Sequence, residues 1–287
     1  MATIVTVLFN GVAYGMLLFI MSVGLSVTMG MMNFVNLAHA SFSMLGGYVL
    51  VVVTHQLGLP FLVSLPLAFI IAGFVSIVLE RTVFRYFYGT DDLTQVLLTL
   101  GLIFMSIAII TYFWGGTYQQ ISVPSWLTGQ QDVLGLTLER YRMFLVAVGA
   151  VLALVLIFGL ERTRFGACVR ACVDNARVAR ACGLNTELVF AVTFAIGGGL
   201  AGLAGALSAN LLGIDPNFPL RYLVYLLIVV SVGGMGTITG TLVAALLLGV
   251  ADVAGKYYAP EIGGFVIYTI TVLVMLWRPH GLMGRRA

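Results

Sequence analysis

Residues 188–214 read LVFAVTFAIGGGLAGLAGALSANLLGI and contain no charged residue. An α-helix rises about 1.5 Å per residue, so about 20 apolar residues cross the hydrocarbon core of a bilayer, and this tract is longer than that. Its apolar residues form a continuous run rather than the alternating pattern of a membrane β-barrel strand. The tract therefore predicts a transmembrane helix.

The rest of the chain has the same character. Of its 287 residues, 61% are hydrophobic and only 9% are charged, and the mean hydropathy is +1.08. A soluble protein carries about 25% charged residues, so this chain has too few to cover a water-facing surface. Soluble enzymes and nucleic-acid-binding proteins are thereby excluded. Further charge-free tracts occupy residues 1–79, 93–131, 143–160 and 222–251, and a shorter one occupies 262–277.

These tracts predict an all-α polytopic membrane protein with eight or nine transmembrane helices, which forms a single domain over residues 1–287. Cytoplasmic loops of membrane proteins are rich in Lys and Arg. We therefore expect a cytoplasmic segment at about 161–187 and a cytoplasmic tail at 278–287, with residues 81–85 on the same side. An external loop is expected at about 115–141, with the N-terminus outside. The basic residues of the first two segments are Arg162, Arg164, Arg170, Arg177, Arg180, Arg278, Arg285 and Arg286.

Two tracts are expected to contain a broken or re-entrant helix. If residues 222–251 were a single span, the Arg-rich tail would lie outside, against the charge rule. We therefore expect two short segments that meet near Gly233-Gly234-Met235-Gly236 and return the chain to the outer face. A second break is expected in residues 29–41, the most polar part of the N-terminal tract. Irregular backbone is tolerated at membrane depth where it is buried in protein or lines a cavity.

Four polar residues in the second region are candidate residues of a substrate path: Asn33, Asn36, His39 and Ser41. The first three recur at every third position, which would place them roughly on one face of a helix. Polar groups at bilayer depth usually face a bundle interior or a pathway. Hydrogen bonds between helices and a discontinuous helix that lines a substrate route explain them equally well.

Small residues recur at a spacing of four, which is typical of helices that pack closely in lipid. We expect their main role to be packing within the bundle rather than dimerisation. The sets are Gly197 with Ala201 and Gly205, Gly198 with Gly202 and Ala206, Gly11 with Gly15, and Gly236 with Gly240.

The segment from Ala167 to Gly183 predicts a short amphipathic helix. Arg170, Asp174 and Arg177 fall at positions i, i+4 and i+7, which would form a solvent-facing stripe. Gly183 suits the position after the helix end, and Asn185 or Thr186 can cap the next helix. By composition, a surface helix anchored to anionic lipid is favoured over a docking element for a cytoplasmic partner.

Several kinds of chemistry have no signature in this chain. There is no Walker A sequence for ATP and no HExxH metalloprotease motif. The three cysteines lack the spacing and companions of a metal site. We therefore predict a non-enzyme without catalytic residues, metal or cofactor. No acidic residue is expected in the middle of a span, where a proton- or sodium-coupled carrier would place one, so the energy for any transport must come from elsewhere.

Motifs along nearly the whole chain resemble the LivH-type permeases of branched-chain amino acid ABC importers. The stretch from Val27 to Ala40, followed by Gly46-Gly47-Tyr48, is similar to the G-x-x-N-F-A-H-G region of that family, with Leu37 and Ala40 as departures that bear on the substrate. The other matching stretches are Arg164 through Arg170-Ala171-Cys172 to Thr186, Gly234-Met235-Gly236-Thr237 with Gly240, and Arg278-Pro279-His280-Gly281-Leu282 with Gly284.

The resemblance implies a permease of a bacterial inner membrane that pairs with a paralogous permease, two cytoplasmic ATPases and a periplasmic solute-binding protein. By the same resemblance, residues 167–183 would be the coupling helix, with Arg170, Asp174, Arg177 and Gly183 at the ATPase contact. The expected solutes are branched-chain amino acids or related small molecules, with urea, short amides or aromatic acids as alternatives. In another functional class, the chain would be a stand-alone channel or a secondary carrier.

Overall fold

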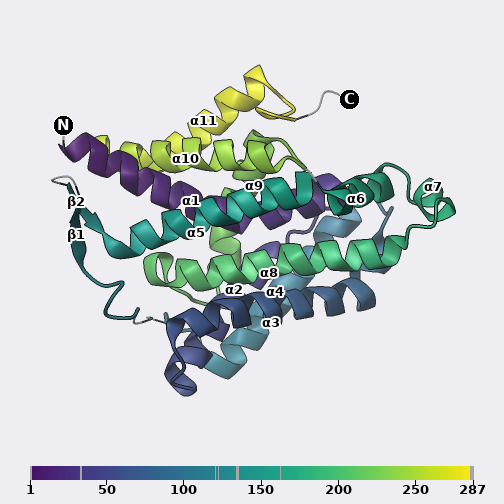
Figure 1. Cartoon of the computed structure of the whole chain (residues 1–287), viewed down its shortest axis with the longest axis horizontal. Helices are drawn as coiled ribbons and strands as arrows, with labels where there is room; N and C mark the ends of the chain where they lie inside the picture. Colours follow the sequence, from purple (N-terminus) through teal and green to yellow (C-terminus); the bar gives the residue numbers. More distant parts are fainter. Residues whose placement is uncertain are drawn as a thin grey trace.

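The computed structural model describes residues 2–32, 34–119, 121, 123–133, 136–161 and 163–284. Over this part the chain folds into a bundle of helices with one antiparallel hairpin, in which Gln130 pairs with Glu139 (Figure 1). The long helices are α1 (Ala2–Met32), α3 (Phe61–Thr82), α4 (Asp92–Trp114), α5 (Arg140–Leu156), α8 (Thr186–Leu212) and α10 (Ile238–Tyr258). The shorter elements are α2 (His39–Val51), α6 (Arg164–Asp174), α7 (Ala176–Ala181), α9 (Phe218–Gly233), α11 (Gly263–Trp277), β1 (Gln130–Val133), β2 (Leu136–Glu139), π-helical turns at Val52–Gln56 and Ile157–Glu161, and a 3₁₀ turn at Phe84–Phe87.

The helices confirm the prediction of an all-α polytopic membrane protein. Six of them, α1, α3, α4, α5, α8 and α10, are long and apolar enough to cross a bilayer. Helices α9 and α11 are apolar but shorter, and α2 is extended by the π-helical turn that follows it. The hairpin was not foreseen, because the segment 115–141 was expected to be a loop throughout.

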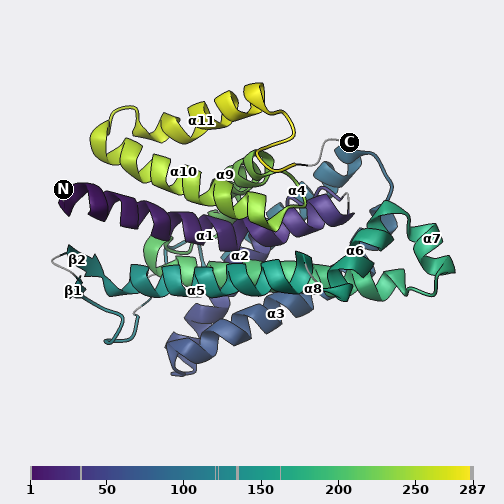
Figure 2. The same cartoon turned by 45° about the horizontal axis from the view of Figure 1, so that its top comes forward.

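The bundle has two distinct ends. Figures 1 and 2 show α6 and α7 at one end, which we call the α7 end, and β1 and β2 at the other, which we call the hairpin end. The N-terminus lies at the hairpin end and the chain after α11 returns to the α7 end. Arg81, in the last turn of α3, pairs with Glu187 in the first turn of α8. The segments that were expected to be cytoplasmic therefore lie together at the α7 end.

Both expected breaks are present. Helix α9 ends at Gly233, and Gly234 and Gly236 have φ angles of 96° and 79°, in the left-handed region that glycine adopts without strain. The second segment is not short, however, because α10 continues to Tyr258. It passes through Asp252, the first residue after the charge-free tract 222–251. The Lys256 Nζ lies 2.6 Å from the Asp252 carboxylate one turn later and neutralises the buried charge.

Glycine faces bring the central helices into backbone contact. Helix α8 uses different small residues for three neighbours, and α1 uses its glycines against α10, so the predicted packing role is confirmed. The contacts join Gly197 to Gly24 in α1, Gly198 and Gly202 to Ser76 and Ala72 in α3, Gly205 to Ser43 in α2, and Gly11 and Gly15 to Val250 and Ala245 in α10. A side chain at these positions would separate the backbones and remove the dispersion contacts that hold helices together in lipid.

The packing can be tested with one glycine at a contact and one outside any contact. An added Cβ at Gly205 would collide with the Ser43 carbonyl oxygen, whereas one at Gly101 in α4 would meet no atom within 4 Å. We expect Gly205→Ala to destabilise the protein by about 1–3 kcal/mol or more, seen as a lower midpoint of thermal unfolding in detergent. Gly101→Ala should leave the midpoint unchanged or raise it, because Ala is the better helix former. Equal midpoints for the two variants would contradict the packing role.

Candidate functional site

The first candidate region is the irregular segment between α1 and α2. Helix α1 ends at Met32 and α2 begins at His39, so the prediction that Asn33, Asn36 and His39 share one helical face is wrong, and the alternative of a discontinuous helix is the one that the fold has. Asn33 lies outside the described residues. The break is stable because a side chain replaces a helical partner: Gln95 Oε1 in α4 accepts a hydrogen bond of 2.8 Å from the Val35 backbone N–H.

Two of the candidate side chains join helices. The ring Nε2 of His39 lies 3.2 Å from the Met21 carbonyl oxygen in α1, and the ring packs against Gly24. The Ser41 hydroxyl accepts a hydrogen bond of 2.9 Å from Ser106 in α4. Both residues therefore have hydrogen bonds between helices, the first of the two interpretations given for these polar residues.

Asn36 behaves differently. Its side chain is buried, with 1% of the residue exposed, and neither amide atom has a hydrogen-bond partner among the described residues. Buried polar atoms without partners are uncommon in native proteins, and in membrane proteins they mark pathways for polar solutes. Three hydroxyls on the adjoining helices α1 and α2 are also buried without a hydrogen-bond partner in the described chain: those of Ser22, Ser43 and Tyr48. Asn36 is thus the candidate residue best suited to bond a passing solute.

The second candidate region is the segment between α5 and α8. It forms two helices, so the prediction of one helix from Ala167 to Gly183 is wrong. Asn175 separates them in an extended conformation, with φ −156° and ψ 93°, and its Oδ1 accepts hydrogen bonds from the Arg177 and Val178 N–H groups. Such N-caps are favourable for Asn. Arg170 and Asp174 consequently lie on α6, and Arg177 lies on α7, so they do not form one stripe.

The two helices differ in how they meet the bundle. Helix α6 packs against the bundle through Val169 and Cys172, which are fully buried. Helix α7 projects beyond the bundle (Figures 1 and 2). Arg177 and Arg180 are exposed on it, and 56% of Val178 is exposed. Helix α7 thus presents two cationic side chains and one apolar side chain on its exposed surface.

The connection from α7 to α8 is rigid. Gly183, at φ 86°, ends α7 as predicted: its N–H bonds the Arg180 carbonyl, and the Leu184 N–H bonds the Ala179 carbonyl, each at 3.0 Å. This pair of bonds is the Schellman motif. Asn185 then caps α8 by accepting a hydrogen bond of 3.1 Å from the Leu188 N–H. Of the two predicted caps, Asn185 and Thr186, it is the first that the structure uses. The end of α7 is thus joined to the first turn of α8 by a short hydrogen-bonded turn.

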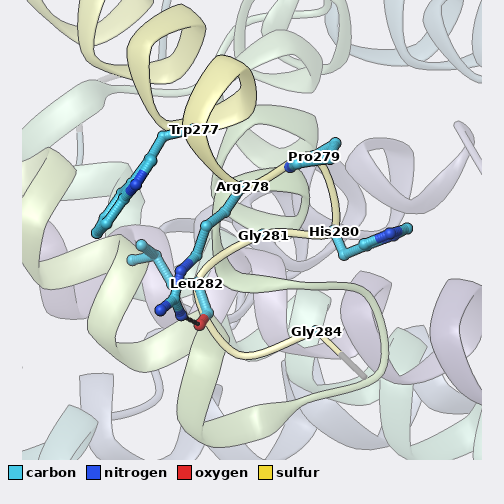
Figure 3. Close-up of a pocket in the computed structure, with 7 residues that line it drawn as sticks. All are labelled: Trp277, Arg278, Pro279, His280, Gly281, Leu282 and Gly284. Carbon is cyan, nitrogen blue, oxygen red and sulfur yellow. Dashed lines mark hydrogen bonds between the residues drawn. The ribbon is translucent and has the colours of Figure 1, made fainter. Parts of the chain in front are cut away.

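A third feature was not foreseen from the sequence. The chain after α11 folds back on the end of α9, where the Leu282 and Met283 N–H groups bond the Val232 and Gly233 carbonyls at 2.8 and 3.2 Å. At this helix end the Gly233 carbonyl also accepts a bond of 3.3 Å from the Thr237 hydroxyl, and the N–H groups after α11 complete the partners that a helix end leaves open. Arg278 Nη1 donates to the Leu282 carbonyl at 3.0 Å, as Figure 3 shows. The turn encloses a groove of about 540 Å³ lined by Trp277, Arg278, Pro279, His280, Gly281, Leu282 and Gly284.

Comparison with known proteins is consistent with this architecture. Residues 7–275 match the family described as branched-chain amino acid transport system / permease component. The chain is 26% identical to BraD, a high-affinity branched-chain amino acid transport system permease protein of Pseudomonas aeruginosa, over 97% of this chain and 95% of BraD. It is 26% identical to LivH of Escherichia coli, over 97% and 94% of the two chains, and 28% identical to LivM of the same organism, over 93% and 68%. No solved structure matches.

The different burial of α6 and α7 predicts different thiol reactivity. Cys182 is exposed after α7, whereas Cys172 is buried in α6. Burial, and secondarily the neighbouring Cys168, raises the pKa of the Cys172 thiol, so less of the reactive thiolate is present at neutral pH. We expect N-ethylmaleimide at pH 7 to modify Cys182 at least tenfold faster than Cys172, measured by mass spectrometry of peptides. Cys182→Ser is the control that should remove the fast phase, and equal rates would contradict the packing of α6.

Proposed function

The chain belongs to the family of branched-chain amino acid transport system permease components, and on this premise we propose that it is the permease subunit of an ATP-driven importer of branched-chain amino acids or closely related solutes. The family match over residues 7–275 carries this proposal. The chain is a multi-pass membrane protein, with six helices in its described part that can cross a bilayer, and its relatives BraD and LivH are named as transport system permease proteins.

The proposed partners follow from the family. LivH and LivM of Escherichia coli are both named as permease proteins of a high-affinity branched-chain amino acid transport system, and both are similar to this chain. We expect this chain to pair with a paralogous permease, two cytoplasmic ATPases and a periplasmic solute-binding protein in a bacterial inner membrane. ATP hydrolysis then belongs to the ATPase subunits, and the binding protein delivers the solute.

The proposed orientation puts the α7 end in the cytoplasm. Arg81, Arg85 and the basic residues of α6 and α7 gather there, and the cytoplasmic side of membrane proteins is the one rich in Arg and Lys. Helix α7 is then the coupling element that the ATPases contact, with Arg177 and Val178 at the contact and Gly183 as its rigid end. Arg170 and Asp174 lie on α6, the helix that precedes α7, and we expect them to take part in the same coupling.

The proposed path passes the break between α1 and α2. Asn36 supplies an amide that can donate to a solute carboxylate and accept from a solute ammonium. Asn33 precedes it in the sequence, and His39 and Ser41 follow it at the start of α2. In alternating access, the two sides of the path open in turn as the helices around this break move.

The coupling role is tested by reversing the charge on α7. Arg177→Glu should lower association with the ATPases and uptake by roughly tenfold or more, since like charges brought together at an interface cost several kcal/mol. Arg177→Lys, which keeps the charge, is the matched control. The measurements are co-purification with the ATPases and uptake in proteoliposomes. Unchanged association and uptake in Arg177→Glu would contradict the docking role, and gradient-driven flux through the chain alone would favour a stand-alone channel or carrier.

The path is tested by removing the Asn36 amide. Because no described protein atom bonds it, Asn36→Ala should leave the thermal midpoint unchanged or raise it, while uptake by the assembled importer falls about tenfold or more. Ser208→Ala is the control, since it also deletes a buried polar group, in this case one bonded within its own helix. Normal uptake in Asn36→Ala would show that the amide lies off the path.

A further inference from the structure

A buried carboxylate lies at the α7 end of α3. Only 3% of Glu80 is exposed, and Tyr88, which follows the 3₁₀ turn Phe84–Phe87, donates a hydrogen bond of 3.0 Å to its Oε1. The second oxygen, Oε2, has no hydrogen bond within the described chain and lies 3.5 Å from Arg81 Nε. Removing a carboxylate from water is costly unless it is fully paired, so the Tyr88 hydrogen bond and the Arg81 contact both favour this position of Glu80.

The neighbours of Glu80 connect it to α7. Arg81 Nη1 donates at 3.2 Å to Glu187 in the first turn of α8, directly after the rigid connection from α7. That exposed pair contributes little by itself. The stronger contact is apolar, because the Tyr88 ring packs edge-on against Phe190 of α8, with ring centroids 5.6 Å apart. A movement of the start of α8 would therefore displace the Tyr88 ring.

The other side of Tyr88 faces the α1–α2 break. Its ring lies edge-on to Phe34, at 5.7 Å and 87°. Phe34 also contacts Phe84 at 5.3 Å and Phe194 at 6.0 Å. These five rings, Phe34, Phe84, Tyr88, Phe190 and Phe194, form what we call the aromatic link. Phe34 is fully buried two residues before Asn36, in a small apolar cluster separate from the main core.

A second contact ties the same loop to the break. Gln95 accepts the bond from the Val35 N–H at 2.8 Å and donates one of 3.1 Å to the Thr90 carbonyl. Thr90 follows Tyr88 by two residues. The loop that carries Tyr88 thus holds the segment 34–36 both by its aromatic ring and through Gln95. A shift of this loop cannot leave Asn36 in place without breaking one of these contacts.

We propose that Tyr88, held by Glu80, is a positioning residue that transmits displacement of α7 through the aromatic link to the Asn36 turn. This inference rests on the proposed function, since it presupposes that the ATPases move α7. Burial, and then the Glu80 carboxylate, raises the pKa of the Tyr88 hydroxyl, so the hydroxyl stays protonated as a donor. Tyr88 and Arg81 contact different oxygens of the Glu80 carboxylate, so Glu80 joins the Tyr88 hydroxyl to the end of α3.

The test uses the complete importer in proteoliposomes, with radiolabelled leucine as the solute. Tyr88→Phe removes only the hydroxyl and should lower the solute transported per ATP hydrolysed by roughly 2- to 30-fold, with the ATPases still associated. Tyr86→Phe is the matched control, because it makes the same change two residues away at a residue that is 65% exposed. Glu80→Gln should cause a similar loss, and the double variant should lose less than the product of the two single effects.

A second readout does not depend on the solute. Val35→Cys, in a chain whose three native cysteines are Ser, reports the accessibility of the break to maleimide. We expect a nucleotide-dependent change in its labelling rate that is reduced in Tyr88→Phe and in Phe34→Leu, which keeps apolar bulk but removes the ring contacts. A merely structural role would lower uptake and hydrolysis in parallel and leave both their ratio and the nucleotide-dependent labelling unchanged, which would overturn the link. A wild-type complex that binds no ATPases would instead contradict the proposed function.

Discussion

The fold depends on backbone contact between helices at glycine. Helix α8 presents small residues to α1, α2 and α3 at once, so three helices reach its backbone. In lipid there is no hydrophobic force between helices, and dispersion contacts of this kind hold them together. Because α8 offers these contacts between Gly197 and Gly205, a short helix such as α2 can pack in the interior. The irregular segment before α2 is then covered by protein rather than by lipid.

The two helix breaks meet at the α7 end. Gly30, near the end of α1, touches Gly236 in the turn between α9 and α10. The first break is satisfied by Gln95 from α4 and the second by the N–H groups of Leu282 and Met283. Backbone groups at membrane depth need such partners. Each break is thus connected to an element distant in the sequence, and the Gly30–Gly236 contact joins the two breaks.

Local sequence signals predicted the ends of elements well and the course of segments between them less well. Gly183 and Asn185 were assigned correctly, because a helix end depends on the residues beside it. The segment from Ala167 to Gly183 was predicted to form a single helix. Asn175, whose side chain caps the second helix, was the signal in the sequence that there are two. Asp252 ends the charge-free tract 222–251 but lies inside α10, because its partner Lys256 lies one turn later in the same helix.

The sequence by itself determined the class of the protein: its long apolar tracts allow only a helical bundle in a membrane, and its Arg residues group the segments of one end. These properties depend on composition and on spacing along a helix. Only the tertiary structure decided which polar residues are bonded. His39 and Ser41 find partners in α1 and α4, while Asn36, on the same short stretch, finds none in the described chain. Partners across helices depend on how the helices pack, and the pattern along a single helix carries no record of that packing.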